Sequence, residues 1–474
     1  MRHTTESSPI RRNARLDVST SASPNTSYYE TEDGPGRDER RRQRDENRKG
    51  LLRFAPRFET EKEPFAFFGA ISLNVLLGSV YCWSCFLVPL EQALGVGRGV
   101  LSWVFSVTTV AFTVAVAKLG PALYSRLKPK TIAAAAAATA GIGMLVAAQA
   151  VTVVSVTPLF VGYGAMFGAA AGVGYGLSVQ ISNAAPFGEG LSVGLVTSAR
   201  AAGAFIFVPV VRYLLDVADV GGAMAAMGAL MLAAAAPLYS TLSAGGLDAP
   251  LASPRRDASV ALSDEERNRD AQLKPAMVTL WATLGLGVSA GLMVISHAAT
   301  LLYSHGASIG VATAGVSVVS MCTSLGRVAG GYACDREKGG PAKVLRLAPL
   351  VAAPALLWAS LAAQSVPAAQ CALAFASLTY GALGTAVPTE VRRRVGAGNF
   401  ARAYGKVFTA WGVAGLAAPA AAGVLYDAAG NYVAALAAAT GLCLLSALAA
   451  ASLKPGRSHE EWEETIRAQA DASA

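Results

Sequence analysis

Apolar runs long enough to cross a membrane constrain this chain more than any other feature of its sequence. The hydrocarbon core of a bilayer is about 30 Å thick, and about 20 apolar helical residues span it. Twelve such runs lie between residues 64 and 453, at about 65–88, 99–117, 131–150, 156–180, 192–214, 219–240, 275–298, 307–331, 344–363, 367–388, 403–425 and 431–452. Hydrophobic residues make up 53% of the chain and charged residues 15%, against about 25% charged in soluble domains. The sequence therefore predicts an all-α membrane protein with twelve transmembrane helices, and it disfavours a soluble enzyme or a nucleic-acid-binding protein.

Polar segments divide the chain. Residues 1–63 are rich in Ser, Thr, Arg and acidic residues and hold few large apolar side chains, so they cannot bury enough apolar surface to fold. The polar stretch 241–274 separates the first six runs from the last six. We expect a disordered cytosolic tail (1–63), an N-terminal six-helix bundle (64–240), a cytosolic linker (241–274), a C-terminal six-helix bundle (275–453) and a second cytosolic tail (454–474).

Basic residues gather in alternate loops, which predicts the orientation. They follow the second, sixth, eighth and tenth runs, whereas the loops on the other side are nearly free of Lys and Arg, apart from Arg98 and Arg212. The basic residues of these loops are Lys118, Arg126, Lys128, Lys130, Arg255, Arg256, Arg267, Arg269, Lys274, Arg336, Lys338, Lys343, Arg346, Arg392, Arg393, Arg394 and Arg402. Cytoplasmic loops carry an excess of Lys and Arg, so we expect the even-numbered loops and both termini in the cytosol. The pattern fits the plasma membrane and an organelle membrane alike.

Two signals recur in the two halves of the chain. Residues 331–339 (GYACDREKG) and residues 120–130 (GPALYSRLKPK) each combine a Gly with a tight basic turn, and Asp335 and Arg336 form a candidate gate motif in the former. Residues 198–209 likewise parallel residues 409–419. Six plus six helices in parallel repeats resemble the major facilitator superfamily. This resemblance implies two pseudo-symmetric six-helix bundles with a binding site between them, near the middle of the membrane.

Further segments carry a narrower resemblance. Residues 81–90 (YCWSCFLVPL), 326–330 (GRVAG) and 399–415 (NFARAYGKVFTAWGVAG) resemble the oxalate/formate antiporter family. The Gly-rich fourth run, continuing into residues 183–194 (NAAPFGEGLSVG), is similar to that family and to the neighbouring monocarboxylate porters. Together these segments imply a carrier of organic anions.

Few ionisable residues lie deep within the runs, and those few are cationic. They are Arg200 in the fifth run, Arg327 in the eighth and Lys406 in the eleventh, with His297 at the end of the seventh, and no Asp or Glu lies near the middle of a run. A charge inside the membrane is costly and marks a wet, functional cavity. Buried cations without a carboxylate repel a cationic ligand and favour an anion. Because a guanidinium binds a carboxylate through two parallel hydrogen bonds, we expect a small organic carboxylate as substrate.

The resemblance to anion carriers implies a role for Arg327 and implies none for Arg200. In similar carriers, an Arg of the eighth helix that matches Arg327 binds the substrate carboxylate; alternatively, Arg327 belongs to a cytoplasmic gate with Asp335. The oxalate carriers also have a Lys where this chain has Trp411, which counts against oxalate as substrate. By the internal repeat Arg200 is symmetric to Trp411, so we expect Arg200 to be the principal anion ligand. The alternative for Arg200 is a polar contact with backbone carbonyls of a neighbouring helix.

Aromatic residues on the same helices form a candidate box around the carbon skeleton of the anion. They are Tyr81, Trp83, Tyr380, Phe408 and Trp411. Phe408 and Trp411 are spaced i, i+3 and therefore share a helix face. The alternative interpretation is that these aromatic side chains are packing residues or membrane-interface anchors.

The sequence gives no reason to expect a metal, a cofactor or an enzymatic site. Cys82 and Cys85 have CxxC spacing but lie in an apolar helix without further ligands, and no phosphate-binding GxxxxGK[ST] loop occurs. We expect no catalytic residues, no nucleic-acid partner and a monomeric functional unit whose partners are its substrate and the lipid bilayer.

The resulting hypothesis is a transporter of small, monocarboxylate-like organic anions that works by alternating access. Exchange (antiport) is the expected mode. Proton-linked symport is the alternative, with His297 or a proton carried by the substrate as the coupling group. The alternative functions are a carrier of a neutral solute and a transport-inactive receptor built on the same helices.

Overall fold

Helices account for every regular element in the part of the chain that the structure, a computed structural model, describes. That part comprises residues 62–182, 187–251, 264–336, 340–362 and 364–454, together with Glu461 and Glu464. Nearly all of the expected N-terminal tail, most of the C-terminal tail and the middle of the expected linker lie outside the described residues. Within those residues, the expectation of an all-helical chain is confirmed.

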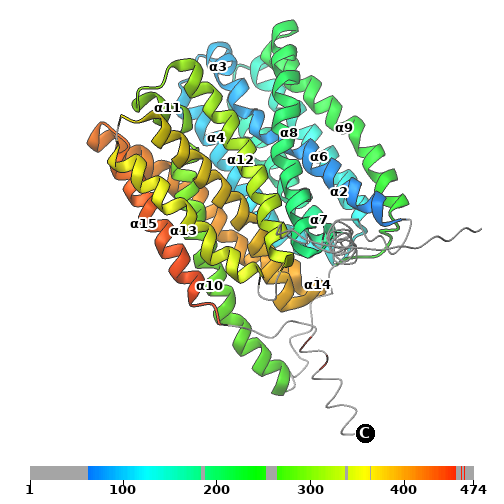
Figure 1. The fold of residues 1–474 in the computed structure, drawn as a ribbon. Helices are drawn as coiled ribbons and strands as arrows, with labels where there is room; N and C mark the ends of the chain where they lie inside the picture. The colour runs from blue at the N-terminus through cyan, green and yellow to red at the C-terminus, as the bar shows by residue number, and fades with distance from the viewer. Residues whose placement is uncertain are drawn as a thin grey trace, which may run out of the picture. The chain divides into compact units, whose positions relative to one another are not determined.

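Short turns of other helix types interrupt several helices of the first half. Figure 1 labels the α-helices that these turns connect, among them α2, α3, α4 and α7. The first run forms α2 (Glu63–Leu77), the 3₁₀ turn η1 (Gly78–Cys82) and α3 (Trp83–Leu94). The next elements are α4 (Arg98–Val114), the π-helical η2 (Ala115–Leu119), α5 (Gly120–Tyr124), α6 (Pro129–Thr152), the π-helical η3 (Leu159–Phe167), α7 (Gly168–Ser182), α8 (Glu189–Val217) and α9 (Val220–Ala244). Departures of this kind from the α-helix often occur at functional positions, and η1 contains Tyr81.

The second half contains one helix that is far longer than a membrane is thick. Its elements are α10 (Asp264–Ile295), α11 (Ala298–Ser304), α12 (Ile309–Arg336), α13 (Gly340–Leu361), α14 (Val366–Ala429) and α15 (Val433–Ala451). A straight helix of 64 residues is about 96 Å long. Gly396 breaks α14 with a φ of 75° and a ψ of 168°, a conformation that suits glycine. The segment expected as a loop between the tenth and eleventh runs is therefore helical except at this break.

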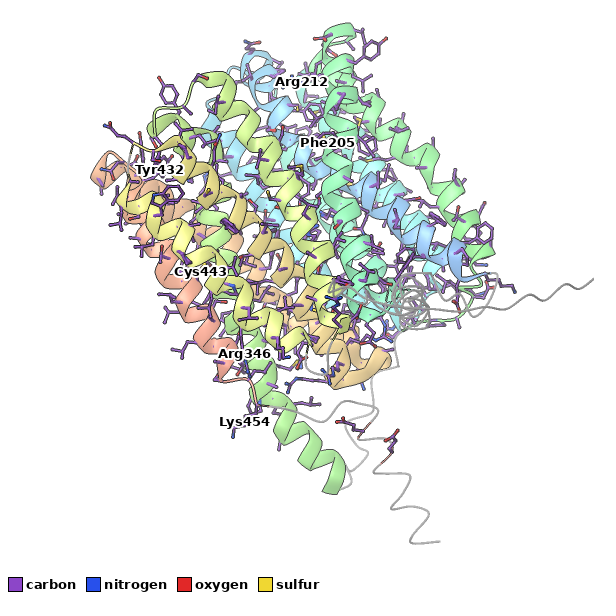
Figure 2. The ribbon with its side chains drawn as sticks, viewed as in Figure 1. Phe205, Arg212, Arg346, Tyr432, Cys443 and Lys454 are labelled. Atoms are coloured by element: carbon purple, nitrogen blue, oxygen red, sulfur yellow. The ribbon has the colours of Figure 1, made fainter. Side chains whose placement is uncertain are left out.

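The helices have the length and surface of membrane spans. Ten helices among the described residues are long and apolar enough to cross a membrane, with α14 counted once. At 28 residues α12 also reaches spanning length. Large apolar side chains cover their outer faces: Phe205, labelled in Figure 2, is 73% exposed and Trp103 is 67% exposed. Such surfaces suit hydrocarbon, and the chain is a multi-pass membrane protein.

Two helix pairs bring the halves of the chain into contact. A Cβ atom on Gly194 of α8 would lie 2.5 Å from the carbonyl oxygen of Arg327 in α12. A Cβ atom on Gly412 of α14 would lie 2.5 Å from the side chain of Thr113 in α4. Since glycines at both places let the backbones approach closely, these pairs form the seam on which the candidate site lies.

Arg346 marks one end of the helix bundle. Arg346 of α13 donates hydrogen bonds to the carbonyl oxygens of Ala450 and Leu453, each over 3.2 Å, and this binds the end of α15 to α13. Figure 2 shows Arg346 and Lys454 at one end of the bundle and Tyr432 at the other. The end with Arg346 is the one where the expected basic loops lie, and we call it the basic-loop end.

Candidate functional site

Arg200 lies near the middle of α8 and is almost completely buried, at 5% exposure. A Cβ atom on Gly78 would clash with the carbonyl oxygen of Arg200, so the break between α2 and α3 packs directly against this turn of α8. The side-chain Nη1 of Arg200 has no hydrogen-bond partner. The helix contact thus involves the backbone of Arg200 and leaves a guanidinium nitrogen available to a ligand.

Aromatic rings surround the Arg200 guanidinium. Its Cζ lies 4.7 Å from the ring centroid of Phe112, 5.7 Å from that of Tyr175 and 5.8 Å from that of Tyr81. Contacts of a cation with ring faces contribute roughly 2 kcal/mol or more where water is excluded. The rings therefore offset part of the cost of burying the charge, and Nη1 of the guanidinium stays without a hydrogen-bond partner.

Arg327 of α12 is also buried, at 6% exposure. Its Nη1 donates a hydrogen bond to the carbonyl oxygen of Thr197, which lies one turn before Arg200 on α8. Its Nε has no hydrogen-bond partner. The Thr197 carbonyl holds the guanidinium of Arg327 against the same part of α8 that carries Arg200, so each half of the chain contributes one cation.

Both guanidinium groups line one cavity of about 30 Å³ between the halves. Its lining residues are Tyr81, Phe112, Tyr175, Arg200, Leu284, Val288, Arg327, Tyr380, Gly384, Pro388, Tyr404, Phe408 and Trp411. This volume holds one or two water molecules. An organic anion therefore requires the lining side chains or the two halves to move apart.

Hydrogen bonds between aromatic side chains fix the cavity wall. The indole Nε1 of Trp411 donates to the hydroxyl of Tyr380 over 2.9 Å, and Trp411 stacks on Phe408 with centroids 5.3 Å apart. The hydroxyls of Tyr175 and Tyr404 lie 3.3 Å apart and link α7 of the first half to α14 of the second. The wall is thus preorganised and presents hydroxyls as well as apolar faces.

Uncompensated positive charge distinguishes this cavity. None of its lining residues is an Asp or a Glu. Asp248, Glu189 and Glu390 form ion pairs with Lys130, Arg392 and Arg394, and not with Arg200 or Arg327. Two buried guanidinium groups without a carboxylate can hold an anion through charge-assisted and bidentate hydrogen bonds.

The structure brings together six of the seven residues expected to contact substrate. Tyr81, Arg200, Arg327, Tyr380, Phe408 and Trp411 line the cavity. Trp83 is not among the lining residues: its ring packs 4.4 Å from that of Tyr163, centroid to centroid. Residues two apart on a helix point in different directions, so Tyr81 and Trp83 do not share a face.

Sequence reasoning missed three aromatic lining residues, Phe112, Tyr175 and Tyr404. A signal existed for Tyr404, because Tyr404, Phe408 and Trp411 are spaced i, i+4, i+7 and follow one face of a helix. No such pattern marked Phe112 or Tyr175. Lys406, on the same part of α14, is exposed and lies outside the cavity.

His297 lies away from the cavity, near Tyr432 at the other end of the bundle (Figure 2). Its Nε2 lies 3.1 Å from the carbonyl oxygen of Pro419, and its Nδ1 lies 3.3 Å from the hydroxyl of Tyr432. Both ring nitrogens therefore have partners within the protein. This arrangement fits a structural histidine better than a coupling residue.

Asp335, at the end of α12, binds the start of α8 instead of Arg327. Its carboxylate accepts hydrogen bonds from the backbone N–H groups of Gly190 and Leu191, each over 2.7 Å. The residue that precedes α8 is Gly188, which has no side chain to cap the helix, so Asp335 supplies the cap from the other half of the chain. Arg336 stacks on the ring of Tyr332, with its Cζ 4.9 Å from the centroid.

Other polar contacts also join the halves at the basic-loop end. Arg392 of α14 pairs with Glu189 of α8 over 3.1 Å. Gln180 of α7 donates to the carbonyl oxygen of Ala397, over 2.9 Å.

A buried ion pair lies within α14. Glu390, 4% exposed, accepts a 2.6 Å hydrogen bond from Arg394 on the same helix. This buried carboxylate lies just beyond the end of the tenth apolar run, so the expectation that the runs hold no acid near their middle does not bear on it.

Among the described residues, no group of three or more His, Cys, Asp or Glu side chains is placed to hold a metal ion. Cys82 and Cys85 are free cysteines. The polar groups of the cavity lining are guanidinium groups, tyrosine hydroxyls and the indole N–H of Trp411.

Comparison with known proteins gives a family and a fold. A model of the Major Facilitator Superfamily matches residues 66–419, well over half of the chain. Among curated protein sequences, none is detectably similar to this chain.

Solved structures of transporters are similar in fold. FucP, a Major Facilitator Superfamily transporter in the outward conformation, superposes with a TM-score of 0.63 at 17% identity, covering 84% of this chain and 100% of FucP. The proton:xylose symporter XylE, bound to 6-bromo-6-deoxy-D-glucose, gives 0.63 at 14% identity, covering 86% of this chain and 100% of XylE. The human organic anion transporter MFSD10 (TETRAN) gives 0.59 at 15% identity, covering 83% of this chain and 100% of MFSD10.

Proposed function

Because the chain belongs to the major facilitator superfamily, we propose that it is a membrane transporter, not an enzyme, and that it carries small organic anions of the monocarboxylate type by alternating access. The observation that carries the proposal is the pair of buried guanidinium groups, Arg200 and Arg327, in one cavity whose lining has no carboxylate. The solved structures that share the fold include carriers of sugars and of organic anions, so the substrate class rests on the cavity itself.

The proposed architecture has twelve membrane crossings in two six-helix bundles, residues 64–240 and 275–453. The break at Gly396 divides α14 into two crossings, and the length of α12 supports one more beside the remaining apolar helices. The basic loops support a cytosolic location for both termini. We take the single chain as the functional unit.

In the proposed mechanism the substrate completes the contact between the halves. Its carboxylate binds Arg200 of α8 and Arg327 of α12, one cation from each half. The rings of Tyr81, Phe408 and Trp411 contact its carbon skeleton, and the Tyr380 hydroxyl lies beside it. Neutralising the guanidinium charges lowers the cost of closing the cavity. An empty carrier then changes sides more slowly than a loaded one, which favours exchange.

The proposed state of the carrier is closed at the basic-loop end. Tyr175 and Tyr404 are 6% and 3% exposed, whereas Tyr81 is 39% exposed. The contacts of Asp335, Glu189–Arg392 and Gln180 also join the halves at that end. We therefore assign Asp335 to the cytosolic gate, with Arg336 beside it, and infer that substrate enters past Tyr81. His297 has no part in this scheme, so a coupled proton would travel on the substrate.

The proposal is tested by counterflow in proteoliposomes that contain the purified protein. Labelled formate, lactate, pyruvate and oxalate, together with a neutral sugar, are offered with and without a proton gradient. We expect exchange of at least one monocarboxylate and none of the sugar. Sugar exchange would support a neutral-solute carrier, and binding without any exchange would support a receptor; either result overturns the proposal.

A further inference from the structure

A second cavity lies on the surface between α12 and α13 at the basic-loop end, away from the substrate site. Its volume is about 390 Å³. Its lining residues are Gly330, Ala333, Arg336, Gly340, Lys343, Val344, Leu347, Ala348 and Val351. We propose that this groove binds an anionic phospholipid, with the phosphate at Arg336 and Lys343 and an acyl chain along the apolar part.

The order of residues along the two helices supports this occupant. Arg336 ends α12 and Lys343 lies in the first turn of α13, so both cations are at the same end of the groove. The helices are neighbours joined by a short connection, and the lining residues farthest from the two cations along the chain are Gly330 on α12 and Val351 on α13. At 1.5 Å per residue, the apolar part extends about 9 Å along α12 and about 12 Å along α13 from the cations. This depth is a large part of one leaflet, whose hydrocarbon is about 15 Å thick.

The lining has the character of a membrane-facing groove. On α13, Val344, Leu347, Ala348 and Val351 recur at spacings of three and four and therefore share one face. Leu347 is 58% exposed and Val351 is 54% exposed. An apolar wall that is this exposed within a spanning helix faces acyl chains. A soluble phosphate compound would leave the wall uncovered, so a lipid fits the groove better.

The charges select the headgroup. Arg336, with its guanidinium resting on the Tyr332 ring, and Lys343 present positive charge at the end of the helices, where phosphates of the bilayer lie. Basic pockets between transmembrane helices are known binding places for anionic headgroups. The neighbouring residue, Asp335, caps α8 of the other half. A lipid on Arg336 therefore lies beside a contact that joins the halves.

The experiment uses the full chain purified in detergent and titrated with dioleoylphosphatidylglycerol, dioleoylphosphatidylcholine or inorganic phosphate. Retained lipid is counted by native mass spectrometry, and the unfolding temperature is followed in parallel. We expect phosphatidylglycerol to be retained and to raise the unfolding temperature more than phosphatidylcholine. The Arg336→Gln/Lys343→Gln variant should bind phosphatidylglycerol about 30-fold more weakly, because two surface cations are lost.

Two further variants separate the groove from general surface charge. Ala333→Phe fills the apolar part without changing a charge, and we expect it to lose phosphatidylglycerol retention as well. Arg126→Gln/Lys128→Gln removes two exposed cations from the corresponding loop of the first half and should bind like the unaltered protein. Equal binding by all variants, loss of binding in the Arg126/Lys128 control, or an equal effect of inorganic phosphate would overturn the proposal.

Discussion

Charged residues gather in two regions of this molecule, and the regions differ in what faces the charge. In the central cavity, Arg200 and Arg327 each keep a guanidinium nitrogen without a hydrogen-bond partner. At the basic-loop end the charged groups meet partners within the chain: Asp335 binds two backbone N–H groups, and Glu189 pairs with Arg392. Both regions join the two halves, but the charges of the second meet groups of opposite charge or polarity within the chain, whereas no carboxylate lines the cavity that holds the first.

This difference separates the residues that bind a ligand from the residues that hold the two halves of the chain together. A buried charge without a partner costs stability, so its presence in a membrane-spanning bundle indicates a use that offsets the cost. Charges that are already paired can open and close a contact as the halves move, without any ligand. We therefore expect changes in the cavity to act on substrate affinity, and changes at the basic-loop end to act on stability and on the rate at which the halves move.

Replacing Arg200 should have the largest effect. Arg200→Gln removes one partner of a buried charge-assisted contact, which costs about 3 kcal/mol, or about 100-fold in uptake. Arg200→Lys keeps the charge but loses bidentate geometry and should fall between Gln and Arg. Uptake is measured by counterflow in proteoliposomes. Lys406→Gln, which removes an exposed cation outside the cavity, is the matched control, and equal losses at both positions would contradict the comparison.

Removing a helix cap should have the next largest effect. Asp335→Ala deletes the cap that α12 supplies to α8 in the other half, whereas Asp219→Ala deletes the cap that Asp219 supplies to Gly222 in its own helix, α9. Each loss costs about 1 kcal/mol of stability and lowers the unfolding temperature. The exchange rate should change several-fold in Asp335→Ala and stay unchanged in Asp219→Ala. If both variants slowed exchange alike, Asp335 would stabilise α8 without controlling how the two halves move.

A smaller effect is expected where the cavity wall loses one neutral hydrogen bond. Tyr380→Phe leaves the indole N–H of Trp411 without its partner, which costs about 1 kcal/mol and should raise KM about fivefold while kcat changes little. The matched control is Thr409→Val, which leaves the indole N–H of Trp281 without its partner outside the cavity. KM should be unaffected there. A similar KM change in both variants would show that the Trp411 contact only stabilises the fold.

The membrane fold was predictable because the bilayer imposes a length. A run of about 20 apolar residues has few alternatives to a spanning helix. The expectation of a membrane-spanning member of the superfamily is confirmed, and the described part of the chain is all-helical as expected. The break at Gly396 was not predictable in the same way. The basic residues around it suggested a loop, but no Pro lies between Pro388 and Pro419, and a single glycine redirects a chain that otherwise stays helical.

The candidate site was predictable where a residue type is rare in its surroundings. Arg200 and Arg327 stand out in apolar helices, and both line the cavity. Phe112 and Tyr175 do not stand out, because aromatic residues are common in such helices. A helix that is apolar on all sides also gives no periodic signal for the face that points inward. Trp83 was assigned to the site for the same reason, since composition alone cannot separate it from Tyr81.

The smallest effect is expected for an exposed ion pair within one half. Lys130 donates a 2.5 Å hydrogen bond to Asp248, and this contact lowers the pKa of the Asp248 carboxyl. A lowered pKa means that the pair contributes stability above the unfolded value, about 3.9, and that this contribution is lost as pH falls through the folded value. Because Asp248 is exposed to solvent, salt screens the pair and the contribution is small.

The unfolding temperatures of Asp248→Asn and of the unaltered protein should therefore differ slightly at pH 7 and converge towards pH 3. The two proteins should transport substrate at the same rate. A transport defect in Asp248→Asn would show that paired charge outside the cavity also governs substrate binding, and the contrast between the two regions would fail.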